Sequence, residues 1–237
     1  MRARINLPVI EKLIISNYSL YPGVDNTGLD LSFTDGVTVI AGINGIGKTT
    51  LLTLLSRMLL GPTDPKKATQ DIGRVSDRKL VNLKSFDFFA SRVPEVLDDK
   101  SIATIKFWLG AEEITVTRYM SNMTLKRVTI SGVPIFPDSE IALIEELARR
   151  AGLLSGYDFH VVVRHLQFFN EERPPLLWDP GSQFELYKIL FFDEQITSSL
   201  NNFFAKIQSV DTDYRNRRHQ LNKRRASLSP SNKSPAT

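Results

Sequence analysis

A glycine-rich stretch near the N-terminus constrains this chain more than any other feature. Residues 42–49 read Gly-Ile-Asn-Gly-Ile-Gly-Lys-Thr, which matches the phosphate-loop pattern G-x-x-x-x-G-K-[ST] at every fixed position. Glycine adopts backbone conformations closed to residues with a Cβ atom, so successive N–H groups can turn toward one phosphate. The apolar run Val37–Ala41 predicts a strand that enters the loop. A helix is expected over Lys48–Leu60, ending at Gly61-Pro62, with its N-terminus pointing at the same anion.

The residues of this loop predict a site for ATP and Mg²⁺. Lys48 can reach the β- and γ-phosphates as a point charge, which makes it the candidate catalytic residue. Thr49 can offer its hydroxyl group to Mg²⁺. A chance glycine-rich turn is the alternative, but Lys-Thr closes the motif and apolar runs flank it on both sides. The nucleotide would contact Asn44, Gly45, Ile46, Gly47, Lys48, Thr49 and Thr50.

Composition excludes several classes of protein. The 237 residues are 42% hydrophobic, which is enough for one substantial core or one domain with an appendage. The chain has no cysteine, so disulfides and cysteine metal sites are impossible, as fits a cytoplasmic protein. Three histidines, at positions 160, 165 and 219, show no metal-ligand spacing. No apolar run approaches the ~20 residues of a membrane span, and the N-terminus lacks the apolar stretch of a signal peptide, so no membrane is expected as a partner.

Charge is distributed unevenly although the net charge is only +4. The segment from residue 215 to residue 233 carries seven basic side chains and no acidic one. Such a basic end suits DNA or an acidic partner, and a solvated disordered tail is the alternative. The basic residues are Arg215, Arg217, Arg218, Lys223, Arg224, Arg225 and Lys233.

The remaining pattern predicts an α/β chain with an antiparallel meander. Strands are expected at Val9–Tyr18 and Leu29–Phe33. Three runs rich in β-branched and aromatic residues, 102–109, 113–119 and 123–130, are separated by turn residues and predict the meander. An amphipathic helix over Asp138–Ala151 would end at Gly152. The apolar run Phe159–Arg164 predicts a buried strand that leads into a loop near Gln167, with residues 61–79 polar and irregular.

The segment Ile189–Glu194 resembles a Walker B motif, in which the Asp of an Asp-Glu pair holds Mg²⁺ and the Glu activates water on a strand. We favour a helix instead. Ser182 and Glu185 have the spacing of a capping box, preceded by an Asp179-Pro-Gly181 turn. Residues then alternate three and four apart in a seam of about five heptads, which predicts a coiled coil. The seam positions are Leu186, Ile189, Asp193, Ile196, Leu200, Phe203, Ile207, Val210, Tyr214, Arg217 and Leu221, and nine of these are apolar or aromatic.

With these pieces in place, residues 9–225 resemble the N-terminal half of an SMC-like, ABC-type ATPase head, a class of coiled-coil ATPases that act in chromosome maintenance, DNA repair and anti-phage defence. The motif Asn-Gly-x-Gly-Lys within residues 42–52 is typical of this family. By this resemblance Asn17, at the end of the opening strand, lies near the adenine and ribose. Gln167 matches the Q-loop glutamine and would bind Mg²⁺ together with Thr49. Ser19 stands where many relatives carry Arg or Lys, so that base contact is not expected here.

The resemblance also implies a domain division and partners. Residues 1–181 would form the N-terminal part of the head, 182–226 a helix leading into a coiled coil, and 227–237 a disordered tail. Relatives complete the site with a signature loop, an Asp-Glu strand and a switch histidine from a C-terminal half, none of which is recognisable here, so we expect a fragment or a split gene. The echo Leu154-Ser155-Gly156-Tyr157 precedes Gln167, which is the wrong order. DNA, a second head and the C-terminal half would be the partners.

Three functions are therefore compatible with the sequence. The first is the ATP-binding half of an SMC-like ATPase, with little turnover on its own because the general base would come from the C-terminal half. The second is a non-catalytic regulatory or assembly module that uses ATP only for structure and docks through its basic end. The third is a self-contained P-loop ATPase in which Asp193 and Glu194 are the metal ligand and the base.

Overall fold

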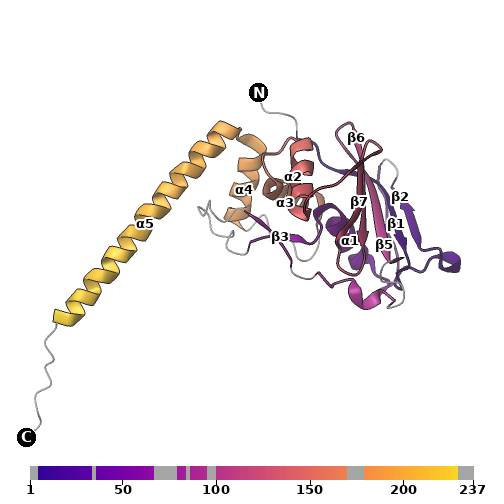
Figure 1. The fold of residues 1–237 in the computed structure, drawn as a ribbon, viewed down its shortest axis with the longest axis horizontal. Helices are drawn as coiled ribbons and strands as arrows, with labels where there is room; N and C mark the ends of the chain where they lie inside the picture. The colour runs from indigo at the N-terminus through magenta and orange to yellow at the C-terminus, as the bar shows by residue number, and fades with distance from the viewer. Residues whose placement is uncertain are drawn as a thin grey trace, which may run out of the picture.

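A six-stranded antiparallel sheet forms the centre of the protein. The computed structural model describes residues 5–33, 36–66, 79–83, 86–94, 100–169 and 179–228 (Figure 1). The sheet has the order β2-β1-β5-β6-β7-β8, and every neighbouring pair is antiparallel. Its strands are β1 (Val9–Ser16), β2 (Leu29–Ser32), β5 (Ile102–Leu109), β6 (Glu112–Tyr119), β7 (Leu125–Ile130) and β8 (Val133–Ile135). The predicted meander is confirmed, with β8 as an additional short strand.

One face of the sheet carries the core. Alternate residues of β5 and β6, such as Ile105 and Val116, are fully buried, whereas their neighbours are polar and half-buried. Helix α1 (Lys48–Leu60) packs on β5 and β6, as Figure 1 shows, and has the predicted bounds. It ends at Gly61 because a φ of 62° at this residue stops the helix without strain. Helix α2 (Glu140–Arg150) confirms the predicted amphipathic helix and buries Leu143, Ile144, Leu147 and Ala148.

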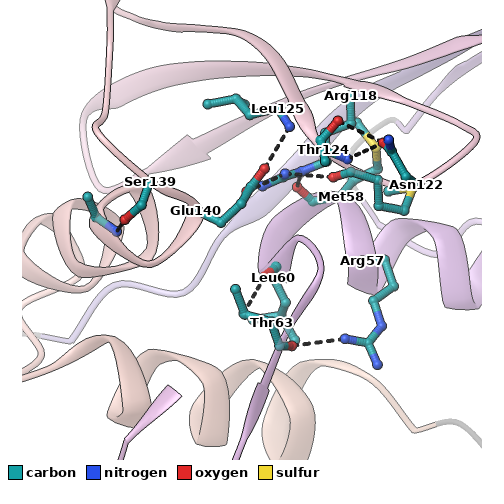
Figure 2. A network of polar contacts seen from close by, with 12 residues as sticks. Arg57, Met58, Leu60, Thr63, Arg118, Asn122, Thr124, Leu125, Ser139 and Glu140 are labelled. Carbon is teal, nitrogen blue, oxygen red and sulfur yellow. Dashed lines mark hydrogen bonds and ion pairs between the residues drawn. The ribbon is translucent and has the colours of Figure 1, made fainter. Parts of the chain in front are cut away.

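A buried ion pair links the sheet to both of these helices. Arg118 of β6 is fully buried, and its Nη1 donates to Glu140 Oε2 of α2 at 2.6 Å and to the carbonyl of Met123 at 3.0 Å. Its Nε donates to the carbonyl of Met58 in α1 at 3.1 Å. The other oxygen of Glu140 accepts the N–H of Leu125 at 2.6 Å, which completes the network in Figure 2. One guanidinium therefore ties together three elements that are distant in the sequence.

Shorter elements extend this body. Strands β3 (Thr63–Pro65) and β4 (Leu80–Asn82) form a separate antiparallel pair, so the segment 61–79, which was predicted to be irregular, contains one short strand near its start. Residues 67–78 lie outside the described ranges. Single turns of 3₁₀ helix cover Val24–Asn26 and Ala90–Arg92.

The apolar run that begins at Phe159 is helical, so the predicted strand over Phe159–Arg164 is wrong. Helix α3 (Gly156–Val162) continues into a π-helical turn, Val163–Gln167. Ser155 caps α3 by accepting the N–H of Asp158. All seven residues of α3 are buried, so no exposed face marks a helical period, and the pattern could not distinguish a buried strand from a buried helix.

Two helices, not a strand, occupy the C-terminal part. Helix α4 (Pro180–Phe191) packs on α3, and α5 (Glu194–Leu228) projects away from the body (Figure 1). The proposed capping box is wrong: Asp179 caps α4 by accepting the N–H groups of Gly181 and Ser182, and Pro180 occupies the first turn instead of belonging to a preceding turn. The break after Phe191 divides the predicted heptad seam between two helices.

Along α5 the seam faces solvent. Of its apolar members only Leu200 is half-buried, and the others are about half exposed or more: Ile196, Phe203, Ile207, Val210, Tyr214 and Leu221. The start of α5 contacts α4, with the rings of Phe184 and Phe204 meeting edge to face at 5.8 Å between centroids. Pairing of this helix in a coiled coil stays a prediction, and most of the predicted tail, residues 229–237, lies outside the described ranges. Within those ranges no helix combines the length and the apolar character that crossing a bilayer requires.

Candidate nucleotide-binding site

The phosphate loop lies open at the beginning of α1. Gly45 and Gly47 have φ angles of 87° and 95°, which residues with side chains rarely adopt. A Cβ atom at Gly45 would meet nothing within 4 Å, so the loop borders open space there. Gly47 is the N-cap residue of α1, and no side chain caps the helix. The backbone N–H groups of Lys48, Thr49 and Thr50 lie in the first turn of α1 and can therefore bind an anion at the N-terminal end of this helix.

Lys48 bridges the entrance of the loop. Its ammonium donates to the carbonyl of Gly42 at 2.7 Å and to that of Ile43 at 2.8 Å. An ammonium has three N–H donors, and the described residues accept two of them. The third therefore remains available to a phosphate oxygen. The positive charge is thus held within the loop, next to the first-turn amides, where a triphosphate would place its negative charge.

A tyrosine that the motif does not include supports the end of the loop. The Tyr21 hydroxyl donates to the carbonyl of Gly47 at 2.7 Å, and the N–H of Leu51 donates to the same oxygen at 2.9 Å. A Cβ atom at Gly47 would lie 2.8 Å from Leu20 Cδ2 and 2.9 Å from the Tyr21 hydroxyl oxygen, so a side chain here would displace the ends of these two residues in addition to straining the φ angle. The sequence carries no signal for this contact because the two residues are 26 positions apart.

The strand that was expected to enter the loop is not formed. Residues 36–41 are exposed and have no regular secondary structure, and they pair with no strand among the described residues, so the prediction for Val37–Ala41 is wrong for this chain. Val37 is 92% exposed, Val39 79% and Ile43 80%. A strand with apolar residues on both faces needs neighbouring strands and cover on both faces, and the antiparallel sheet described above does not extend to it.

Asn17 holds the end of β1 close to the next strand. Its side-chain amide donates to the carbonyl of Lys100 at 2.9 Å, and its own carbonyl accepts the hydroxyl of Ser101 at 2.5 Å. Its φ of 56° is in the left-handed region, which asparagine tolerates better than most residues. The Ser19 hydroxyl donates to the carbonyl of Arg92 at 2.6 Å. These contacts explain the turn after β1, and the contact of Asn17 with a nucleotide stays a prediction.

Gln167 lies at the end of the π-helical turn and not at the end of a strand. Its amide nitrogen donates to the carbonyl of Pro8 at 2.7 Å, and its amide oxygen is buried without a hydrogen-bond partner among the described residues. No hydrogen bond joins this side chain to Thr49 within the described ranges. The exposed Thr49 fits a Mg²⁺ ligand. In Gln167 the amide oxygen would be the metal ligand, and this oxygen is buried, so the metal role of Gln167 stays a prediction.

The Asp-Glu pair that resembles Walker B begins a helix. Asp193 caps α5: its carboxylate accepts the N–H of Ile196 at 2.8 Å, and its carbonyl accepts that of Thr197 at 2.9 Å. Glu194 is the first residue of α5. A carboxylate used as a helix cap, away from any described strand, lacks the setting of a Walker B ligand. Among the described residues no group of three or more His, Cys, Asp and Glu gathers into a metal site.

A small hollow opens beside the C-terminal half of α1. The Arg57 guanidinium pairs with the Asp64 carboxylate at 3.0 Å, and His160 Nε2 lies 3.6 Å from the same carboxylate. Burial raises the pKa of Asp64, but hydrogen bonds from His160 and Arg57 and the Arg57 charge outweigh it and lower this pKa to about 2. Burial lowers the pKa of His160, so Arg57 carries the charge opposite Asp64 at neutral pH. The lining residues are Thr53, Ser56, Arg57, Leu60, Asp64, His160, Arg164 and Phe168.

Acidification should destabilise the protein in two steps because of this cluster. Both His160 and Asp64 have folded pKa values below their ordinary values of 6.5 and 3.8, so the unfolded chain binds protons first as the pH falls. We expect the free energy of unfolding to decrease below about pH 6.5 and again, by about 2 kcal/mol, between about pH 5 and pH 2. Urea unfolding across this range measures it. His160→Gln should flatten the upper step and also reduce the lower one, because the hydrogen bond from His160 is the largest of the causes that lower the pKa of Asp64. An unchanged upper step would contradict the assignment.

Comparison with known families agrees with the geometry of the loop. The family model of an AAA domain matches residues 12–227, which include the phosphate loop, the central sheet and both C-terminal helices. No curated protein matches the chain at a significant level. The matched region begins within β1 and ends within α5, so it covers most of the described structure. The chain therefore belongs to the AAA domain family, whose members are P-loop ATPases, and ATP is the expected ligand of the loop around Lys48.

Proposed function

We propose that this chain is the ATP-binding half of an SMC-like ATPase head, which turns over ATP only when another polypeptide segment completes its sheet. The exposed apolar residues before and within the phosphate loop carry this proposal. Val37, Val39 and Ile43 are about 80–90% exposed, although full burial of each such side chain would contribute about 1.5–3 kcal/mol. Strands from a completing segment would cover these residues and hold Lys48 and its loop in position.

The residues of the loop account for binding and charge stabilisation but not for activation of water. The first-turn amides and Lys48 would hold the phosphates and stabilise the charge that develops during phosphoryl transfer. Mg²⁺, when bound, would neutralise charge between the β- and γ-phosphates, with Thr49 as one ligand. Glu194, the base candidate of the Asp-Glu pair, is the first residue of helix α5 and does not lie on a strand, so a general base is expected from the completing segment or a second head.

Helix α5 supports the proposed assembly. Its exposed seam offers apolar residues at coiled-coil spacing, which suits a partner helix. Its distal part, from Arg215 to Arg225, carries six exposed basic side chains without an acidic one, which suits DNA or an acidic partner. The likeness to chromosome-maintenance, repair and anti-phage ATPases makes DNA the partner we propose, together with a second copy of the head.

Binding and turnover of ATP by the purified chain test the proposal. We expect a fluorescent ATP analogue to bind weakly with Mg²⁺ present, and hydrolysis to stay near background. Turnover at the rate of an ordinary ATPase, about 1–10³ per second, would contradict the proposal if Lys48→Ala abolished it. The exposed basic end favours a second candidate, a non-catalytic module, which would be supported by salt-sensitive DNA binding that neither ATP nor Lys48→Ala changes.

Substitutions at the Asp-Glu pair separate the proposal from a self-contained ATPase. We expect Asp193→Asn and Glu194→Gln to leave ATP binding and background hydrolysis unchanged. Asparagine caps a helix about as well as aspartate, whereas Asp193→Ala should destabilise the start of α5 by about 1 kcal/mol. Circular dichroism during urea unfolding measures the cap, and a colorimetric phosphate assay measures hydrolysis. Loss of hydrolysis in Glu194→Gln with an unchanged fold would favour the self-contained enzyme.

A further inference from the structure

We propose that Tyr21 is a positioning residue of the phosphate loop, which orients the Lys48 backbone amide toward the bound phosphate. The inference rests on the proposed function of the loop and adds a residue that the phosphate-loop motif does not contain. It concerns the Tyr21 hydroxyl group, the carbonyl of Gly47 and the peptide unit that joins Gly47 to Lys48.

The carbonyl of Gly47 accepts two hydrogen bonds, which fix the direction in which it points. The Tyr21 hydroxyl donates at 2.7 Å and the N–H of Leu51 at 2.9 Å, so both lone pairs of this oxygen are used. In a trans peptide the C=O and N–H bonds lie in one plane and point in opposite directions. Holding the carbonyl of Gly47 therefore holds the N–H of Lys48 on the opposite side, at the first position of α1.

This peptide needs external support more than most. Glycine has a wide choice of backbone conformations, and Gly47 has a φ of 95° at the junction between an exposed loop and a helix. Among the described residues no side chain caps α1, so the first turn lacks a capping hydrogen bond on its N–H side. The Leu51 bond alone is an ordinary helical bond that allows the terminal peptide to tilt. Tyr21 supplies the second restraint from the side opposite the anion.

Tyr21 can act in this way because it is itself held in place. Its ring packs against that of Tyr18, with the centroids 5.8 Å apart, and Tyr18 is almost fully buried. The N–H of Tyr21 donates to the carbonyl of Tyr18 at 3.0 Å, which closes the turn after β1. Burial raises the pKa of Tyr21 to about 12, so its hydroxyl stays protonated and able to donate at physiological pH. The end of β1 is thereby connected to the phosphate loop.

Two matched substitutions test this role. Tyr21→Phe removes only the hydroxyl that contacts Gly47, and Tyr18→Phe removes a buried hydroxyl from the same aromatic pair without touching the loop. Displacement of a fluorescent ATP analogue by ATP and by inorganic tripolyphosphate reports phosphate affinity with and without a base. We expect Tyr21→Phe to weaken both ligands about 3- to 10-fold, with an unchanged urea midpoint, and Tyr18→Phe to bind as the wild type does.

Each result distinguishes the positioning role from its alternatives. Weaker ATP binding with unchanged tripolyphosphate binding would assign Tyr21 to the adenine base and overturn the inference. If Tyr21→Phe bound both ligands as the wild type does, the inference would be overturned. The proposed function would still stand in that case, provided that the wild type binds ATP and that Lys48→Ala abolishes this binding. If the wild type bound neither ligand, the proposed function would fail, and nuclear magnetic resonance would still decide the inference. In the free protein the Lys48 amide should lose order in Tyr21→Phe and keep it in Tyr18→Phe.

Discussion

Replacing Lys48 with alanine should reduce ATP affinity by about 10- to 100-fold and leave the stability of the fold almost unchanged. A hydrogen bond between charged groups contributes about 1.5–3 kcal/mol, and the ammonium of Lys48 would make such a bond to a phosphate oxygen. In the free protein it donates to the carbonyls of Gly42 and Ile43. Both residues are exposed, so water replaces the lost donor at little cost. Titration with a fluorescent ATP analogue measures the affinity, and urea unfolding measures the stability.

Lys206→Ala is a suitable control for this experiment. Lys206 lies on the exposed surface of α5, so its loss changes the net charge by the same amount at a place remote from α1 in sequence. It should bind ATP as the wild type does. Equal losses of affinity in the two variants would show that total charge, and not the position of the ammonium in the loop, attracts the nucleotide. An affinity that is unchanged in Lys48→Ala would remove the central argument for the site.

The elements that could be predicted from the sequence are those whose ends and faces are set by nearby residues. Helix α1 begins directly after Gly47 and ends before Gly61, and both glycines have a positive φ, which residues with side chains rarely adopt. The meander follows from alternating residues and short turns. The same local reasoning failed at α4, where Asp179 and Pro180 were taken for a turn although an Asp cap followed by Pro is also a common helix start.

The features that could not be predicted depend on tertiary contacts with residues that are distant in the sequence. Val37–Ala41 has the composition of a buried strand, but a strand forms only where a neighbour accepts its hydrogen bonds, and none does among the described residues. Phe159–Val162 is buried on all sides, which removes the periodicity that would identify a helix. The loop residues were predicted from the motif, whereas the contact from Tyr21 and the anchoring of Gln167 at Pro8 arise from tertiary packing alone.

Replacing Arg118 with alanine should greatly reduce the free energy of unfolding, whereas Lys48→Ala should leave it almost unchanged. Arg118 is fully buried, and it bonds to the carboxylate of Glu140 and to the carbonyls of Met58 and Met123. Its removal leaves the Glu140 charge without its partner and opens a cavity between the sheet and α1. Breaking a buried ion pair in this way costs about 3–5 kcal/mol, a large part of the typical 5–15 kcal/mol of a folded domain. Urea unfolding followed by circular dichroism measures the loss.

An exposed ion pair on α2, the helix that carries Glu140, provides the control. Arg149 pairs with Glu146 at 2.7 Å but is 67% exposed, so Arg149→Ala should cost at most about 0.5 kcal/mol. A double variant locates the cause of the larger effect. In Arg118→Met with Glu140→Gln the glutamine oxygen can still accept the N–H of Leu125 while no unpaired charge remains. We expect this variant to be more stable than Arg118→Met alone. If the two were equally stable, the loss would reflect packing of the Arg118 side chain and not the uncompensated charge of Glu140.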